Sequence, residues 1–446
     1  MRPALPASRP QPAAVDGAGA ARWGPVLALA GLHGAVTLAW VVYTLYLVAL
    51  LARAGFDAYL ASVLLTVEGL VGAVLEPLAG ALSDRARSGI FRRFFLVMGG
   101  VLATSFLFVA LPLAAASSRP GPASLLPALL LAWSCAMAVF RAPALSLLGR
   151  YARPGSLPLA ASVLVAAGGL VSAAAPSARA WLLSLGPLPT FAAASAALLA
   201  AALVLRALDR RMPLPVAAPG PVPAPDRATR RAGWSLFLVG TTAALAFRFL
   251  VDGLPRAGAA PGAPAALITT AFFPATAMAG IPLGRLALGR VGGGPVTAGG
   301  LGVLILGATA PLVLAGVVPV LVSTALLGAA LAAVQNGLLA CSLSAVRVER
   351  AGLGMGLLLG GGGLALGLFN LLLAVRRPAP ATSLLAAAGL YALTLALLRG
   401  VRPAAGSAPR TRGTPADRRR AAGTMRLSRT TSPSSPAPPC SGCRGW

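Results

Sequence analysis

The stretch GALSDRARSGIFRR, residues 80–93, places one aspartate and four arginines between two long apolar runs. Residues 58–79 and 94–116 offer roughly 22 and 23 positions, each about the ~20 that an α-helix needs to cross the hydrocarbon core of a bilayer. Charged side chains are costly inside that core. The stretch therefore predicts a short loop at a membrane surface, with Asp84 and its arginines in water or among lipid headgroups.

The composition of the whole chain is that of an integral membrane protein. Apolar residues make up 57% of it, charged residues only 11%, and the mean hydropathy is +0.82. The formal charge of +27 would suggest a nucleic-acid partner in a soluble protein, but all 37 basic residues are arginine. Heavy use of Ala, Gly, Pro and Arg without Lys is typical of a GC-rich coding sequence. We therefore expect a bacterial source, a lipid bilayer as the surroundings and no nucleic-acid partner.

The apolar runs divide the chain into two halves of six. They cover residues 24–51, 58–79, 94–116, 123–149, 159–176, 186–207, 233–251, 265–284, 295–316, 318–345, 353–375 and 381–399. We expect an arm at 1–23, one half at 24–207, a Pro- and Arg-rich linker at 208–232, a second half at 233–399 and a disordered tail at 400–446. The predicted fold is all-α, with twelve transmembrane helices in two pseudo-symmetric six-helix bundles.

Internal repetition indicates that the halves are related. Recurring features occur at residues 85 and 285 (Arg), 89 and 289 (Gly), and 168–170 and 362–364 (Gly-Gly-Leu). The second copy is incomplete, because Gly284 stands where Asp84 would be. Whatever Asp84 does is therefore expected to be done once.

The arginines predict the orientation. If the N-terminus is cytoplasmic, the cytoplasmic segments without the tail carry 19 arginines and the outer loops carry six. This is the positive-inside bias of membrane proteins. We expect a multi-pass protein of the cell (inner) membrane with both termini cytoplasmic, and a basic tail that can rest on anionic lipid.

Ser83-Asp84-Arg85, followed by the pair Arg92-Arg93, resembles the signature loop of the major facilitator superfamily, most closely its sucrose and glycoside symporter branch. That branch usually has a glycine, three basic residues and a proline here, where this chain has Phe91, Arg92, Arg93 and Phe94. The resemblance implies alternating access, a monomer, and a conformational gate. Its residues would be Gly80, Asp84, Arg85, Arg92 and Arg93.

Charged residues inside the apolar runs are functional hypotheses by default. At ~1.5 Å per residue, Glu76 lies ~12 Å from Asp84 and Arg141 lies ~13 Å from Arg150 on the same side of the membrane. The sequence therefore predicts a Glu76–Arg141 pair. It either only holds two helices together or takes part in gating and coupling.

Glu68 lies ~24 Å from Asp84 and has no obvious charged partner at that depth. Burial disfavours its charged form, which suits a proton-coupling site with protons as the coupling ion. The alternative is a protonated carboxyl that is hydrogen-bonded to a neighbouring helix.

In the superfamily the first, fourth, seventh and tenth helices line the central cavity. The resemblance thus implies substrate contacts at Tyr43, Arg141, Arg248, Gln335 and Asn336. Arg248 has an alternative, because Asp252 is one helical turn away and the arginine could reach water near the helix end. His33 and Asn370 are further polar residues within the runs.

The sequence predicts neither metal, cofactor nor enzymatic activity. Cys440 and Cys443 would need two further zinc ligands, and the only histidine lies in an apolar run. A P-loop is absent, so an ion gradient or the substrate gradient is expected to drive transport. Small-molecule transport, of the sugar or glycoside symport type, is the leading hypothesis. The alternatives are proton-driven efflux of amphipathic compounds and a non-transporting sensor or scaffold.

Overall fold

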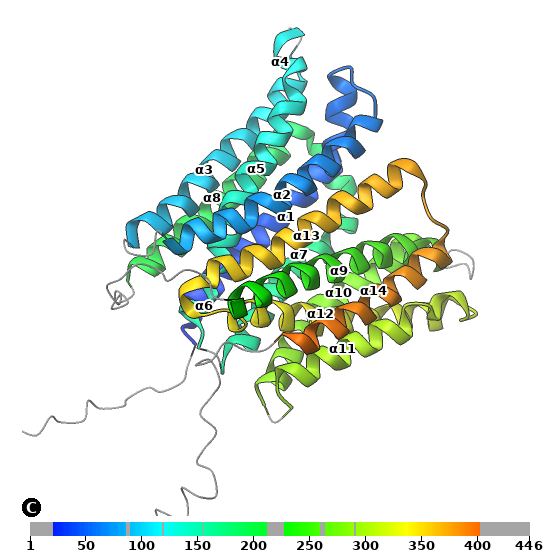
Figure 1. Cartoon of the computed structure of the whole chain (residues 1–446). Helices are drawn as coiled ribbons and strands as arrows, with labels where there is room; N and C mark the ends of the chain where they lie inside the picture. Colours follow the sequence, from blue (N-terminus) through cyan, green and yellow to red (C-terminus); the bar gives the residue numbers. More distant parts are fainter. Residues whose placement is uncertain are drawn as a thin grey trace, which may run out of the picture. The chain divides into compact units, whose positions relative to one another are not determined.

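The structure is a computed structural model that describes residues 21–85, 90–117, 120–153, 155–211, 227–258, 264–289 and 291–401. These residues belong to one compact unit, Met1–Ser407, and a second unit, Ala408–Trp446, lies outside them. The described residues form helices and connecting turns and contain no strand (Figure 1). The predicted N-terminal arm lies outside the described residues except for its last three positions, and the predicted tail except for its first two.

Twelve helical segments of the described part are long and apolar enough to cross a membrane, as the sequence predicted, and the ninth of them, Gly293–Leu312, is a helix extended by a short turn. The helices are α1 (Trp23–Arg53), α2 (Tyr59–Arg85), α3 (Ile90–Ala115), α5 (Leu126–Leu145), α7 (Leu157–Leu185), α8 (Pro187–Arg210), α9 (Arg227–Gly258), α10 (Ala265–Leu288), α11 (Gly293–Gly307), α12 (Val317–Ser344), α13 (Ala351–Val375) and α14 (Pro380–Gly400), with short turns α4 (Pro120–Ser124), α6 (Leu148–Tyr151), η2 (Ala310–Leu312) and η3 (Val348–Arg350).

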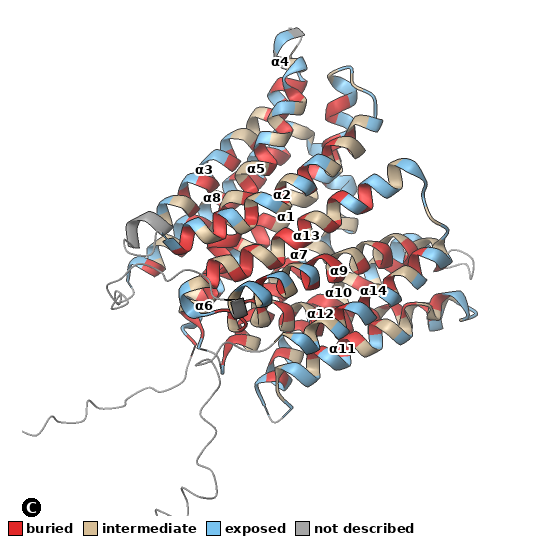
Figure 2. Cartoon of the chain, viewed as in Figure 1, coloured by how far each residue is buried: buried red, intermediate tan, exposed pale blue. Residues whose placement is uncertain are grey.

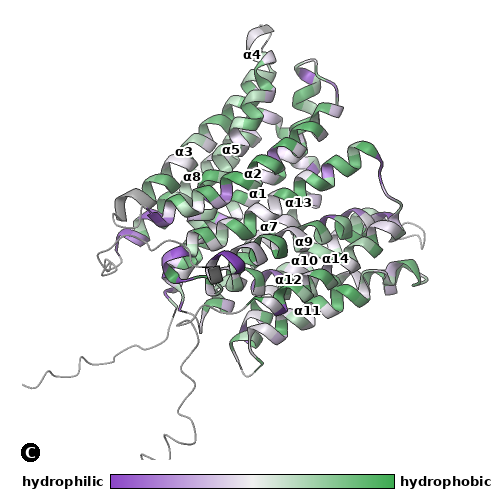
Figure 3. Cartoon of the chain, viewed as in Figure 1, coloured by the Kyte–Doolittle hydropathy of each residue, from purple (hydrophilic) through white to green (hydrophobic). Residues whose placement is uncertain are grey.

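The surface of these helices is apolar between their ends. Large apolar side chains such as Phe95, Phe106 and Leu306 are 77%, 76% and 82% exposed, and hydrophilic residues gather mainly at helix ends and turns (Figure 3). In hydrocarbon every backbone N–H and C=O must be paired within the protein, which a helix achieves along its own length. The apolar runs are therefore helices whose outer faces meet lipid.

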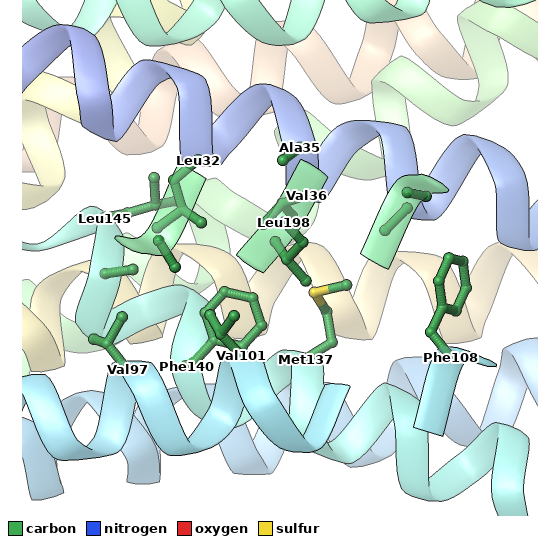
Figure 4. Close-up of a cluster of buried hydrophobic side chains, with 14 of the residues drawn as sticks. Leu32, Ala35, Val36, Val97, Val101, Phe108, Met137, Phe140, Leu145 and Leu198 are labelled. Atoms are coloured by element: carbon green, nitrogen blue, oxygen red, sulfur yellow. The ribbon is translucent and has the colours of Figure 1, made fainter. Parts of the chain in front are cut away.

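Each half has its own core. The first contains buried residues mainly from α1, α3, α5, α7 and α8, including Leu32, Val101, Phe140 and Leu198 (Figure 4). The second is built entirely from residues 239–391. The two six-helix bundles of the predicted fold therefore correspond to two separate hydrophobic cores.

The halves meet mainly through two helix pairs, α2 with α13 and α7 with α10, supplemented by α7 with α12. Glycines carry the first contact, because a Cβ at Gly69 would meet the Gly367 backbone nitrogen at 2.4 Å and one at Gly80 would meet the Gly352 oxygen at 2.1 Å. Small residues let helix backbones approach this closely. The α2–α13 interface can therefore be sealed without side chains between the backbones.

Several predicted boundaries are wrong, among them the end of the helix expected at 233–251, which continues to Gly258, and the end of the run expected at 295–316, whose helix stops at Gly307. The helix expected at 58–79 continues to Arg85, and the helix expected at 159–176 continues to Leu185 with Pro176 inside it. Proline is tolerated in membrane helices, where neighbouring groups satisfy the freed carbonyl. The linker expected at 208–232 is shorter, because α8 runs to Arg210 and α9 begins at Arg227; residues 212–226 lie outside the described residues.

Candidate functional site

A partly open cavity of about 590 Å³ lies between the halves and is lined by both. Helices α1, α2, α5 and α7 of the first half and α9, α12, α13 and α14 of the second contribute to it. Most lining side chains are apolar or glycine. The polar ones are His33, Thr37, Thr44, Glu68, Glu76, Ser134, Arg141, Arg248, Gln335, Asn370 and Tyr391.

Glu76 and Arg141 form an ion pair between α2 and α5 at this cavity, through a guanidinium Nη2 and a carboxylate oxygen. Glu76 is 2% exposed, whereas the Arg141 side chain keeps 23% of its surface accessible. The pairing expected from equal depth is therefore present. Each charge would be strongly unfavourable alone inside the bilayer, so the pair stabilises the contact of α2 with α5.

Glu68 has no charged partner among the described residues, but it is hydrogen-bonded to a neighbouring helix, as one of the two alternatives predicted. The Tyr43 hydroxyl donates a hydrogen bond to its carboxylate oxygen, and the Tyr43 ring stacks on Trp133 with centroids 4.4 Å apart. Tyr43 is fully buried and is not among the residues that line the cavity, so its placement at the cavity surface is wrong. A depth comparison extended to tyrosines would have found this contact. Tyr43 and Glu68 each lie about 15 Å from the α1–α2 turn.

Of the other expected substrate contacts, Arg248 and Gln335 line the cavity and Asn336 does not. The Asn336 Nδ2 donates to the Gly280 carbonyl at 2.9 Å, which ties α12 to α10. The adjacent Gln335 faces the cavity instead, because successive residues of an α-helix are rotated by about 100° about its axis. The sequence spacing could not say which of the two adjacent amides faces inward.

The proposed contact of Arg248 with Asp252 is not present. Asp252 instead forms ion pairs with Arg256 and Arg377 and accepts a hydrogen bond from Ser383. Arg248 is half-buried, lines the cavity, and makes no ion pair or hydrogen bond with any residue that the structure describes. The arginine therefore stays at the cavity instead of reaching the helix end.

Asp84 engages the opposite half through the first turn of α13. Its two carboxylate oxygens accept hydrogen bonds from the backbone N–H of Gly352, at 2.9 Å, and of Leu353, at 2.7 Å. The first N–H groups of a helix have no intrahelical partner and carry partial positive charge, so they suit a carboxylate. Asp84 is 4% exposed. The expectation that it lies in water or among headgroups is wrong, because these amides replace its hydration.

The other gate residues are placed less fully. Gly80 lies where α2 touches the Gly352 backbone, and Arg85, the last residue of α2, is exposed. The side chains of Arg92 and Arg93 lie outside the described part of the chain.

The repeat explains why Asp84 has no counterpart. A Cβ at Gly284 would meet the Ser162 hydroxyl oxygen at 2.3 Å and the Leu159 Cα at 3.3 Å, so α10 and α7 leave no space there for an aspartate. If the Gly-Gly-Leu sequences are aligned, Gly352 corresponds to Pro158, near the start of α7. Proline has no backbone N–H to donate. The second copy therefore lacks both the acceptor and one donor of this contact.

The two main contacts between the halves, α2 with α13 and α7 with α10, are tightly packed at the same end of the bundle. This is the end where α2 ends and where α13 and α7 begin. We call this the closed end, and the end at the α1–α2 turn the opposite end. Nine of the ten buried residues of α7 lie between Leu157 and Gly169, and no buried residue of α13 follows Asn370. The end of α13 that leads to α14 is mainly exposed or intermediate in Figure 2. The cavity is therefore sealed by tight helix packing on one side only.

Among the described residues, no group of three or more His, Cys, Asp or Glu side chains is placed to hold a metal ion. Cys440 and Cys443 lie outside those residues. His33 lines the cavity beside Gly168, and its Nδ1 has no hydrogen-bond partner among the described residues. The Asn370 Nδ2 donates to the Leu366 carbonyl within its own helix.

No protein-family model matches the chain, and no curated protein matches it in sequence. Solved structures match its fold. The human organic anion transporter MFSD10 (TETRAN) is 16% identical with a TM-score of 0.62, over 84% of this chain and 99% of that one. A bacterial homologue of the iron transporter ferroportin in an outward-facing state is 16% identical with a TM-score of 0.63, over 84% and 98%. The same homologue with soaked iron is also 16% identical, with a TM-score of 0.64 over 84% and 98%.

At this identity the likeness establishes the fold. The chain shares the fold of these transporters, and the predicted fold of twelve membrane-spanning helices is confirmed.

Proposed function

We propose that this chain is a secondary transporter, a member of the major facilitator superfamily, that moves a small molecule across a membrane by alternating access. The observation that carries the proposal is a cavity lined by both halves and closed at one end by Asp84 on α13. A rocking motion of the halves around such a central site would expose it to each side in turn. The fold shared with solved transporters supports the same reading.

The arginine bias assigns the closed end to the cytoplasm. In that orientation both termini are cytoplasmic, the membrane is the inner membrane of a bacterium, and the described conformation is outward-facing. The bacterial ferroportin homologue that shares the fold is also described as outward-facing. The protein works as a monomer, since each half finds its partner within the same chain.

The cavity lining favours an amphipathic substrate over a sugar. A sugar presents hydroxyl groups on all sides and needs many hydrogen-bonding side chains, whereas most lining residues here are apolar or glycine. Sugar or glycoside symport is therefore the weaker of the two transport hypotheses. Movement of amphipathic compounds, including export, is the stronger one.

Protons are the proposed coupling ion. Glu68 and Glu76 each keep one buried carboxylate oxygen without a hydrogen-bond partner among the described residues, and both line the cavity. A carboxyl in this position can bind a proton from the open side and release it to the other. When Glu76 binds a proton, it would lose its negative charge and release Arg141. When it loses the proton, the ion pair with Arg141 would form again.

Alternating access can be tested without knowing the substrate, by measuring distances between spin labels in lipid nanodiscs. Cysteines at Gly155 and Val348 report on the closed end, and cysteines at Ala58 and Ala379 on the opposite end; all four positions are exposed. We expect two populations, in which the first distance is long whenever the second is short. A single population at both ends, unchanged by pH or membrane potential, would instead support a non-transporting sensor or scaffold.

A further inference from the structure

We propose that the cavity binds an organic anion, an apolar molecule with one carboxylate, and that Arg248 is the residue that holds the carboxylate. This inference rests on the proposed transport function and names its substrate class. Arg248 lies on α9, and its guanidinium, although it lines the cavity, makes no ion pair or hydrogen bond with any described residue. An unpaired charge at this depth is costly unless a ligand completes it.

Arg248 is the arginine of the described cavity lining that has no carboxylate partner. Glu76 is paired with Arg141, and Glu68 accepts the hydrogen bond of Tyr43. The guanidinium of Arg141, which also lines the cavity, repels the positive charge of Arg248. When Glu68 holds the proton proposed for it above, two guanidinium groups share the cavity with one ionised carboxylate, that of Glu76, which favours a ligand of negative charge.

Besides the Glu68 and Glu76 oxygens and the His33 Nδ1, the cavity lining has three unsatisfied polar groups that can donate a hydrogen bond. The indole N–H of Trp40, the hydroxyl of Tyr391 and the Nε of Arg141 are buried without a partner among the described residues. Tyr391 lies on α14, which packs on α9, and both it and Arg248 are about 15 Å from the opposite end of their helices. A carboxylate, which only accepts hydrogen bonds, complements such groups.

The rest of the ligand is apolar. The lining includes Phe247, Leu331, Val334 and Leu366, and the volume of about 590 Å³ falls in the range of drug-sized ligand pockets. Arginine is well suited to this position, because its planar fork of donors matches a carboxylate bidentately. Size and lining together indicate a molecule with at least one ring and a single anionic group.

The test compares 2-naphthoate with its neutral isostere 2-naphthamide as probes, by equilibrium binding to the full-length protein in nanodiscs. We expect the carboxylate to bind at least tenfold more tightly than the amide. Arg248→Gln should weaken carboxylate binding far more than amide binding and so remove this preference, and Arg248→Lys should retain part of it. Arg179→Gln, which removes an exposed arginine outside the cavity, is the matched control.

Equal binding of the two probes, failure of both to bind the folded protein, or an unchanged preference in Arg248→Gln would overturn the proposal. A second measurement is independent of any ligand. A cysteine at Ala244, one turn before Arg248 on the cavity wall, should react faster with an anionic than with a cationic methanethiosulfonate, relative to a cysteine at Ala58. Arg248→Gln should lower that ratio about tenfold, and an unchanged ratio would contradict the assignment.

The probe binding is measured at equilibrium, the cysteine modification is measured as a rate, and neither needs transport. If the distance changes expected for alternating access occur but neither probe is preferred, the substrate class is wrong and the transport function stands. If the carboxylate binds through Arg248 but the halves do not move, the transport function is wrong and the binding site stands.

Discussion

Replacement of Asp84 by asparagine should shift the protein toward the conformation that is open at the closed end. The two hydrogen bonds from Gly352 and Leu353 to the carboxylate exist only while α2 and α13 are in contact. Asparagine keeps one acceptor oxygen, so one bond and the negative charge at the start of α13 are lost. A hydrogen bond to a charged group contributes about 1.5–3 kcal/mol, and a carboxylate near a helix N-terminus up to about 2 kcal/mol.

Because these contributions overlap, the loss is about 2–3 kcal/mol, which is a change of about 30- to 150-fold in the ratio of the two conformations. The assay is the distance distribution between spin labels at positions 155 and 348, together with labelling of cysteines at both ends. We expect a longer distance, higher accessibility at the closed end and slower turnover. Substrate affinity should change only as far as the shift in populations requires.

Asp57→Asn is the matched control. Asp57 accepts a hydrogen bond from the Tyr59 N–H at 2.7 Å at the start of α2, so the same charge is removed from a helix N-terminus. Both partners of that bond belong to one half, and the conformational ratio should not move. The reasoning is refuted if Asp84→Asn folds normally but leaves the distance distribution and both accessibilities at wild-type values, or if it abolishes binding while they stay unchanged.

Three further predictions concern the interface, the buried pair and the orientation. Gly80→Ala should shift the same distance distribution more than any change at an exposed helix position, because its Cβ would meet the Gly352 oxygen at 2.1 Å. Glu76→Gln and Arg141→Gln should each lower the folded yield by more than the double variant does, since each leaves one buried charge unpaired; additive effects in this double-mutant cycle would show that the two do not interact. In intact cells, an impermeant thiol reagent should label a cysteine at Ala58 and not one at Glu349, and the reverse pattern would invert the orientation.

The sequence predicted how deep in the membrane each residue of the site lies. Glu76 and Arg141 pair because residues at the same depth on adjacent helices are brought together whatever the details of packing. The same reasoning missed Tyr43, which lies at the depth of Glu68, because only charged residues were compared. Asn336 was misplaced for a different reason. Depth does not fix rotation about the helix axis, and its amide faces α10 instead of the cavity.

The sequence by itself determined that the chain spans a membrane twelve times in two related halves, since the length of each apolar run must match the thickness of the hydrocarbon and charges are excluded from it. It also marked Asp84 as a residue without a repeat counterpart. Only the tertiary structure decided what Asp84 binds. The donors are backbone amides of Gly352 and Leu353, and every residue except proline has such a group, so no side chain in the sequence distinguishes them. It likewise decided that Arg248 stays at the cavity without an ion pair to any described residue, because Asp252, one turn away, is held by Arg256 and Arg377.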